Sequence, residues 1–385
     1  MENNNDNKVL NVPHLRFPEF TEEWVNVSLK DVADFQKERI SSGLLDESTY
    51  ISTENILQNF QGVQSAISIP ANTNVVAYKK NDILLSNIRP YLKKVWFSDR
   101  IGGCSADVFV LRSKTCEPEF LYNVIASDKF INYVMSGAKG VKMPRGDKNQ
   151  MESFSFSIPA VVEQRKISRL FQLLDERIVT QNKIIEDLKK LKSAIIDQLY
   201  SAIKGKGYSY RQIFEIVNER NKQLEYSNIL SASQEKGMVN REDLNLDIQF
   251  ERSNINTYKV VRKGDYVIHL RSFQGGYAFS DKIGVCSPAY TILRPNDLLE
   301  FRYLSYYFTS QKFIKSLIIV TYGIRDGRSI NVEEWLDMKT TIPQKEQQRH
   351  IVDTIRNIEK KIENEELYAS YLSKQKQYLL RQLFI

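Results

Sequence analysis

Cysteine and histidine are scarce in this sequence, and no apolar run is long. The three cysteines, Cys104, Cys116 and Cys286, form neither a C-x-x-C pair nor a Cys/His ligand spacing, which argues against a disulfide framework and against zinc. No stretch approaches the roughly 18–20 uninterrupted apolar residues that cross a bilayer. The Asn-rich start, residues 1–10, lacks the charged-then-apolar pattern of a signal peptide. These features predict a soluble cytoplasmic protein.

Motifs of catalysis and cofactor binding are also missing. The sequence has no G-x-x-x-x-G-K-[ST] loop for ATP, no G-x-G-x-x-G, and no Asn/Asp-Pro-Pro-aromatic segment of an amino-methyltransferase. No carboxylate–lysine cluster stands out as a nuclease centre, and His14, His269 and His350 are scattered. We therefore expect no catalytic residues, no metal site and no cofactor in this chain.

The length and the charge leave room for more than one domain and for an anionic partner. At 385 residues, the chain is longer than most single domains, and its 42% hydrophobic content suits sizeable cores. Lys and Arg number 54 against 47 Asp and Glu, which gives a net charge of +7 and a pI near 9.0. This excess fits a polyanion, although many proteins without such a partner are as basic.

The strongest pattern is an internal repeat with a period of about 183 residues. The segment 79–112 resembles the segment 262–294 with a single one-residue gap. The matches continue to an Ile-Pro pair in each half, which a Gln-Arg pair follows. The matched residues are Lys80 with Lys263, Asp82 with Asp265, Phe97 with Phe279, Asp99 with Asp281, Cys104 with Cys286, Glu119-Phe120 with Glu300-Phe301, Phe130 with Phe313, Ile158-Pro159 with Ile342-Pro343, and Gln164-Arg165 with Gln348-Arg349.

The predicted long helices occupy 159–204 and 343–385, and after the first residue of each range, Pro159 or Pro343, the roughly forty remaining residues contain neither Gly nor Pro. Apolar residues recur there every three or four positions, which predicts two helices, each on the order of 60 Å long at about 1.5 Å per residue. Because each apolar stripe is narrow, we expect the two helices to pack as an antiparallel coiled coil. Gln181 and Glu365 interrupt the stripes at corresponding points. We expect them to form a polar layer that sets the register, unless both side chains simply face solvent.

The rest of each half predicts a mixed α/β domain, at 1–158 and 205–342. Short apolar runs at 82–85 and 264–268 predict strands. Periodic stretches near 120–135 and 301–319 predict helices, and Gly205-Lys206-Gly207 predicts a linker that ends the first long helix. The predicted fold class is α+β: two mixed α/β domains separated by two long antiparallel coiled-coil helices in an internal tandem repeat.

A family resemblance rests on the opening run and on the order of the segments. The sequence Val12-Pro13-His14-Leu15-Arg16-Phe17-Pro18-Glu19-Phe20, with Trp24 after it, resembles the start of type I restriction–modification specificity (S) subunits. The order of variable domain, helix, variable domain and helix is similar to theirs over essentially the whole chain. The resemblance implies a non-catalytic protein whose two target-recognition domains each read one half of a bipartite, asymmetric site in double-stranded DNA.

The resemblance also implies partners and the location of the chemistry. Two adenine-methyltransferase subunits and restriction/translocase subunits would assemble on this chain, and no membrane would be involved. S-adenosylmethionine, ATP and Mg would be held by those partner subunits, with no cofactor on this chain.

Basic, amide and aromatic residues in the loops that differ between the halves are the candidate DNA contacts. Arg and Gln pair bidentately with guanine and adenine, whereas Lys more often meets phosphates. For any single residue, a solvated turn charge is an equally common role. The candidates are Arg89, Tyr91, Lys93, Lys94, Lys139, Lys142, Arg145, Arg271, Gln274, Arg325 and Arg328.

One alternative is a coiled-coil DNA-binding regulator that is not attached to a methylase. Such a regulator would normally reuse one small recognition element rather than carry two large, divergent domains. A single-chain nuclease or methylase would need the missing motifs. A purely structural coiled coil would not need about 270 residues of globular sequence.

Overall fold

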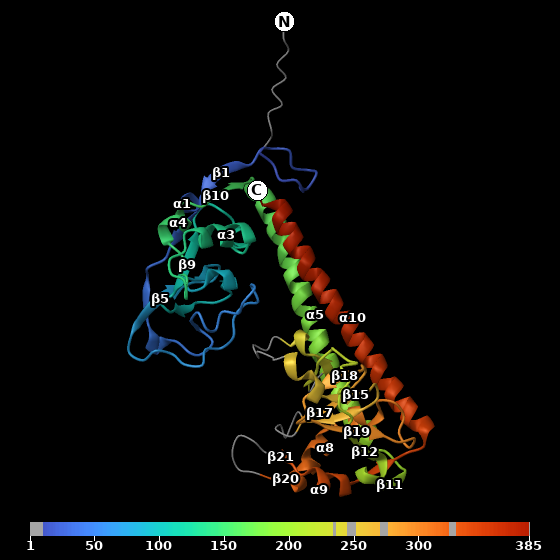
Figure 1. Cartoon of the computed structure of the whole chain (residues 1–385). Helices are drawn as coiled ribbons and strands as arrows, with labels where there is room; N and C mark the ends of the chain where they lie inside the picture. The colour runs from blue at the N-terminus through green and yellow to red at the C-terminus, as the bar shows by residue number, and fades with distance from the viewer. Residues whose placement is uncertain (1–10, 234–235, 245–251, 270–275, 323–328, 385) are drawn as a thin grey trace. The chain divides into compact units, whose positions relative to one another are not determined.

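The computed structural model describes residues 11–233, 236–244, 252–269, 276–322 and 329–384 (Figure 1). The chain divides into two compact units, of which the first comprises Met1–Asn182 with Leu367–Ile385 and the second Lys183–Glu366. Each unit therefore holds one globular part and one portion of each long helix. The domain limits predicted from the sequence, by contrast, separate the helices from the globular parts. No helix in the described part of the chain is long and apolar enough to cross a membrane.

The first unit contains two four-stranded sheets and a two-stranded ribbon. One sheet has the order β2-β9-β6-β7 and is antiparallel throughout; the other has the order β3-β5-β8-β4, in which β4 and β8 run parallel. The ribbon pairs β1 with β10 and brings the two ends of the globular part together. The strands are β1 (Val25–Ser28), β2 (Ala33–Phe35), β3 (Arg39–Ser41), β4 (Tyr50–Ile51), β5 (Asn74–Tyr78), β6 (Ile83–Ser86), β7 (Val95–Phe97), β8 (Gly102–Cys104), β9 (Val108–Ser113) and β10 (Ser155–Ile158).

The second unit repeats the central sheet and the ribbon. Its four-stranded antiparallel sheet has the order β12-β19-β16-β17, and its ribbon pairs β11 with β22. The remaining pairs are β13 with β14, β15 with β18 and β20 with β21. The strands are β11 (Lys206–Ser209), β12 (Phe214–Val217), β13 (Leu230–Ser233), β14 (Gly237–Asn240), β15 (Lys259–Val261), β16 (Tyr266–Ile268), β17 (Tyr277–Phe279), β18 (Gly284–Cys286), β19 (Thr291–Pro295), β20 (Thr321–Tyr322), β21 (Ser329–Ile330) and β22 (Lys339–Ile342). The strands predicted at 82–85 and 264–268 are confirmed as β6 and β16.

A buried ion pair supports the same turn in both sheets. Asp82 binds the guanidinium of Arg112 at 2.8 and 2.7 Å, and Asp265 binds that of Arg294 at 2.9 Å through both oxygens. Both aspartates are 2% exposed, and each also accepts the backbone N–H of the residue three positions before it. The Asp match in the repeat therefore marks a structural pair that holds β6 to β9 and β16 to β19.

The helix predicted near 120–135 is wrong as one element, because the chain breaks into α2 (Pro118–Ile125) and α3 (Asp128–Ser136). The stretch 301–319 likewise breaks into α7 (Tyr303–Tyr307), α8 (Gln311–Ser316) and a short 3-10 turn. Ser127 and Ser310 cause these breaks, since each hydroxyl caps a new helix by accepting the N–H three residues on. The remaining short helices are α1 (Leu29–Val32), α4 (Lys148–Glu152), α6 (Tyr210–Ile213) and α9 (Val332–Asp337).

The long helices α5 (Val161–Ser201) and α10 (Lys345–Leu383) pack antiparallel in both units (Figure 1). In the first unit, the Lys376 ammonium binds both oxygens of Asp175 at 2.6 and 2.8 Å. In the second unit, Lys192 binds Glu359 at 3.0 Å and Lys189 binds Glu366 at 2.7 Å. The residue numbers run in opposite directions along the two helices, as an antiparallel pair requires.

The Ile-Pro and Gln-Arg pairs of the repeat tie the start of each long helix to its own unit. The Gln164 amide donates to Pro159 O at 2.8 Å and its oxygen accepts the N–H of Glu117 at 2.9 Å. In the second unit, Gln348 does the same with Pro343 O and the N–H of Glu300. Glu117 is therefore the counterpart of Glu300. The match of Glu119-Phe120 with Glu300-Phe301 is therefore wrong by two residues. Both pairs are a Glu-Phe dipeptide in an apolar stretch, but the glutamine of the first unit binds Glu117 and not Glu119.

The linker predicted at Gly205-Lys206-Gly207 is wrong in part, because Lys206 begins β11 and pairs with Ile342. Gly205 is packed so closely that a Cβ there would lie 2.3 Å from the carbonyl oxygen of Ile342. Only the short stretch between Ser201 and Gly205 connects the helix to the strand.

The cores of both units enclose cysteine, since Cys104, Cys116 and Cys286 are all buried. Burial raises the pKa of each thiol to about 12, whereas an unfolded thiol titrates near about 8.5. A folded pKa above the unfolded one means that this contribution to stability is complete below about pH 8.5 and is lost as the pH rises toward 12.

We therefore expect the free energy of unfolding to fall between pH 8.5 and pH 10, by up to about 1.4 kcal/mol per pH unit for each thiol. Urea unfolding at both pH values measures the slope. In the triple Cys→Ala variant, the free energy of unfolding should fall less per pH unit. The buried tyrosines remain in this variant, so their contribution to the pH dependence is unchanged. An unchanged slope in that variant would exclude the thiols as the cause.

Candidate nucleic-acid interface

Four predicted contact residues of the first unit lie in the connection between β6 and β7. This segment forms a tight 3-10 turn, Pro90–Leu92, flanked by Arg89 and Lys93, which both adopt left-handed backbone conformations at φ 51° and 54°. Such φ values are uncommon for side chains larger than glycine, so the turn needs support. The support comes from the N–H of Arg89, which donates to Pro144 O at 2.8 Å. Arg89 and Tyr91 are exposed, whereas Pro90 between them is buried.

The second predicted loop lies against the first. Lys139 and Arg145 exchange two backbone hydrogen bonds of 3.0 and 2.9 Å, and the Gly146 N–H donates to Asn87 O at 3.2 Å. Between them the chain turns at Gly140, whose φ is +97°. The structure therefore brings the basic residues of the two loops, 52 residues apart in sequence, onto one surface of the first unit.

Several predicted cations on this surface are paired within the unit. Lys93 binds Asp128 at 2.6 Å, Lys139 binds Asp147 at 3.0 Å and Arg145 binds Asp107 at 2.9 Å. The Lys94 ammonium donates to Thr53 O, and burial lowers its pKa. Lys93 is therefore held against the start of α3, and Lys94 against the segment that follows β4.

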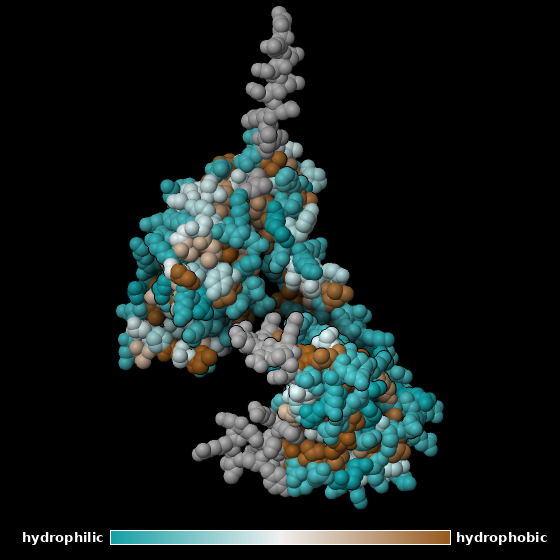
Figure 2. Space-filling model, viewed as in Figure 1, coloured by the Kyte–Doolittle hydropathy of each residue, from teal (hydrophilic) through white to brown (hydrophobic). Residues whose placement is uncertain are grey.

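Arg89 and Lys142 are exposed, and neither makes an ion pair with any residue that the structure describes. Lys139 is paired but 82% exposed, so it can exchange Asp147 for another anion. The loop tip adds two exposed apolar side chains, Val141 and Met143. Elsewhere the visible surface of each unit is mainly hydrophilic, with hydrophobic residues in small groups (Figure 2).

A third loop at this surface, residues 58–61, was not predicted from the sequence because it contains no basic residue. The N–H groups of Asn59 and Phe60 donate to Leu92 O and Lys93 O at 3.1 and 3.0 Å. Both residues have positive φ, which presents the neighbouring Gln58 and Gln61 amides to solvent. Exposed amides beside a basic turn can read adenine edges. In the sequence, the polar residues Asn59 and Gln61 are the one sign that this segment is an exposed turn.

The candidates of the second unit, Arg271, Gln274, Arg325 and Arg328, lie outside the described residues. Their segments connect strands that pair with each other. β16 and β17 flank 269–276, where the His269 N–H donates to Gly276 O at 2.6 Å, and β20 and β21 flank 323–328. The first of these connections corresponds to the Arg89 loop between β6 and β7.

The predicted register residues differ in burial. Gln181 is 5% exposed, so its side chain does not face solvent as the simpler alternative required. Glu365 is half-buried and forms an ion pair with Lys361, one turn earlier on α10. Their proximity stays a prediction. Among the described residues, no three His, Cys, Asp or Glu side chains gather in a way that could hold a metal ion.

Comparisons with known proteins agree on one family. A family model for the type I restriction modification DNA specificity domain matches residues 21–190. The chain is 24% identical to the type I restriction enzyme MjaVIII specificity subunit of Methanocaldococcus jannaschii. The alignment of 407 residues covers 96% of this chain and 93% of that protein.

Two solved structures share the fold. One is a chain from work on complex assembly and conformational transition of the type I R-M system, with a TM-score of 0.61, 18% identity, and coverage of 93% of this chain and 96% of that one. The other is the type I restriction-modification system S subunit from M. genitalium, with a TM-score of 0.54, 14% identity, and coverage of 97% and 99%.

Proposed function

Since this chain belongs to the type I restriction–modification specificity subunits, we propose that each of its two units reads one part of a bipartite, asymmetric site in double-stranded DNA. The observation that carries the proposal is the surface where Arg89 and Lys142 are exposed without ion pairs. The repeat supports it as well. The buried Asp–Arg ion pairs and the hydrogen bonds of Gln164 and Gln348 are the same in both units. The loops between β6 and β7 and between β16 and β17 differ in sequence, as two different half-sites require.

We further propose that the chain is a non-catalytic scaffold for other subunits. Two adenine-methyltransferase subunits would bind it and supply S-adenosylmethionine chemistry, and restriction/translocase subunits would supply ATP- and Mg-dependent cleavage. The polar layer of Gln181 and Glu365 would set the register of the helix pair, and the buried Gln181 supports it.

Methylation mapping tests the proposal against the regulator alternative. The purified chain is combined with the methyltransferase subunit of the proposed complex and with a library of random DNA, and methylated adenines are located by sequencing. We expect two short conserved blocks separated by a fixed, unread spacer. The chain alone should bind DNA but methylate none. Methylation without the chain, or one uninterrupted block, would contradict the proposal.

Two variants of the first unit separate base reading from phosphate binding. Arg89→Ala should weaken binding to the cognate site by about 1–3 kcal/mol and to scrambled DNA far less. Lys142→Ala should weaken both alike and reduce the log–log salt slope by about 1. Fluorescence anisotropy at several salt concentrations measures both, with Lys190→Ala on α5 as the control for a lost surface charge. Equal losses on both DNAs for Arg89→Ala would assign Arg89 to the backbone.

A further inference from the structure

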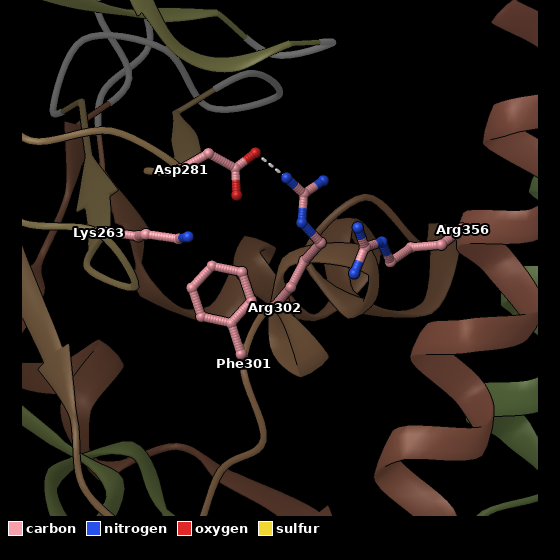
Figure 3. A pocket seen from close by; sticks show the side chains of 5 residues that line it. All are labelled: Lys263, Asp281, Phe301, Arg302 and Arg356. Carbon is pink, nitrogen blue, oxygen red and sulfur yellow. Dashed lines mark hydrogen bonds and ion pairs between the residues drawn. The ribbon is translucent and has the colours of Figure 1, made fainter.

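The second unit has a cationic pocket that none of the predicted DNA contacts line. Its volume is about 430 Å³, and its walls come from Lys263, Asp281, Phe301, Arg302 and Arg356 (Figure 3). Lys263 lies in the turn between β15 and β16, and Asp281 lies between β17 and β18. Phe301 and Arg302 precede α7, and Arg356 projects from α10.

Two of the three cations are available to a ligand. Arg302 forms an ion pair with Asp281, so these two charges offset each other. Lys263 sits over the Phe301 ring at 5.5 Å and, like Arg356, makes no ion pair with any described residue. The nearby Glu359 carboxylate is already bound by the Tyr306 hydroxyl at 2.7 Å and by Lys192 at 3.0 Å. The pocket therefore presents a net charge of +2 around a half-exposed aromatic ring.

This charge is specific to the second unit. With Glu117 as the counterpart of Glu300, and Gln164 as that of Gln348, each lining residue has a defined counterpart in the first unit. The counterparts are Lys80, Asp99, Pro118, Glu119 and Gln172. They carry a net charge of −1, so the pocket is not part of the framework that both units need to fold.

The surface beside the pocket is covered in the first unit and open in the second. In the first unit, the N-terminal segment lies over the start of α5: Arg16 binds both oxygens of Glu163 at 2.8 Å, and Lys166 lies over the Phe17 ring at 4.6 Å. In the second unit, the start of α10 instead lines an open groove of about 1170 Å³. Arg349 and Asp353 of that groove lie on the same face of α10 as Arg356 of the pocket, so the groove and the pocket follow one another along that face.

Two observations favour a protein ligand over DNA. First, the equivalent surface of the first unit is covered by a polypeptide segment without helix or strand, which includes Arg16 and Phe17. Second, the pocket lies at the opposite end of the β16–β17 hairpin from the predicted recognition loop. Tyr266 pairs with Phe279 at the pocket end, and Ile268 pairs with Tyr277 at the loop end.

We propose that this pocket, with the groove beside it, docks an extended acidic segment of a partner protein subunit, whose carboxylates bind Lys263 and Arg356 while an apolar side chain packs on Phe301. The proposal rests on the function proposed above, because it assigns the segment to the methyltransferase subunit. Since the counterpart residues of the first unit carry a net charge of −1 rather than +2, two copies of that subunit would bind this chain with unequal affinities.

A pair of charge-matched double variants of the full chain tests the proposal. Lys263→Glu with Arg356→Gln alters the pocket, and Lys80→Glu with Gln172→Glu makes the same change in net charge at the counterpart positions. Titration calorimetry with the methyltransferase subunit of the proposed complex, at 50 and 300 mM NaCl, measures the binding steps. Anisotropy with cognate and scrambled duplexes measures DNA binding by the chain alone.

We expect the pocket variant to weaken the affinity of one of the two partner-binding steps by about tenfold and to reduce the salt dependence of that step. The counterpart variant should change the affinity of the same step by less than twofold. DNA binding should differ by less than twofold between the variants. Equal partner binding by both variants overturns the proposal, as does a loss confined to DNA binding, which would make the pocket a phosphate site. If the wild-type chain binds no methyltransferase subunit, the proposed function fails and this inference falls with it.

Discussion

Replacing Phe384 by alanine is expected to destabilise the first unit by about 3 kcal/mol, the usual cost of removing a buried phenyl ring. Phe384 is 8% exposed, and its ring lies 5.2 Å from that of Phe120 and 5.9 Å from that of Phe171. Leu380 and Leu383 are buried in the same core. The last residues of the chain thus complete a core whose other members come mainly from its first half.

Hydrogen exchange under native conditions localises this effect. Amides of β6 and β9 should lose protection in the Phe384→Ala variant, whereas those of β16 and β19 should keep theirs. Tyr378→Ala is the control, because Tyr378 lies on the same helix but is 57% exposed. Equal loss in both units would mean that the two cores unfold as one cooperative body.

The long helices and the central strands could be predicted from local pattern alone. About forty residues without Gly or Pro and with 3–4 apolar spacing leave few alternatives to a helix. The strand pairs at β6 and β16 follow from short apolar runs after turns. The break at Ser127 could not be predicted in this way, because the apolar period continues across it and only the capping hydroxyl reveals it.

Tertiary contacts decided the features that the sequence left open. The counterpart of Glu300 is settled by a hydrogen bond to Gln348, a residue 48 positions away. The basic loops at 86–94 and 137–146 are separate candidates in the sequence, and backbone pairing of Ile88 with Arg145 places them together. Their acidic partners, Asp107, Asp128 and Asp147, could not be inferred, since nothing in the sequence connects them to those cations.

The pair of long helices is expected to set the distance between the two half-sites of the proposed DNA site. Both α5 and α10 continue through the boundary between the units, and each unit keeps its own ion pairs between the two helices. Four helix-forming residues added to each helix, between Asn182 and Lys183 and between Glu366 and Leu367, would preserve those pairs. The insertion adds about 6 Å of rise and about 40° of rotation beyond a full turn.

A DNA base-pair step rises about 3.4 Å and rotates about 35°, so we expect the recognised spacer to lengthen by one to two base pairs while both half-sites keep their bases. The stretch around Gly205 is unsuitable for the insertion, because Gly205 packs against Ile342 and Lys206 begins β11. Methylation mapped across a library of spacers, with wild type and variant side by side, measures the change.

The control is the same insertion in α5 alone. There the added residues have no partner in α10, so they should loop out, and the spacer should stay as in the wild type. An unchanged spacer in the double insertion would show that something other than the helix pair sets the distance. Altered bases in either half-site would show that each unit does not read its half-site independently of the helices.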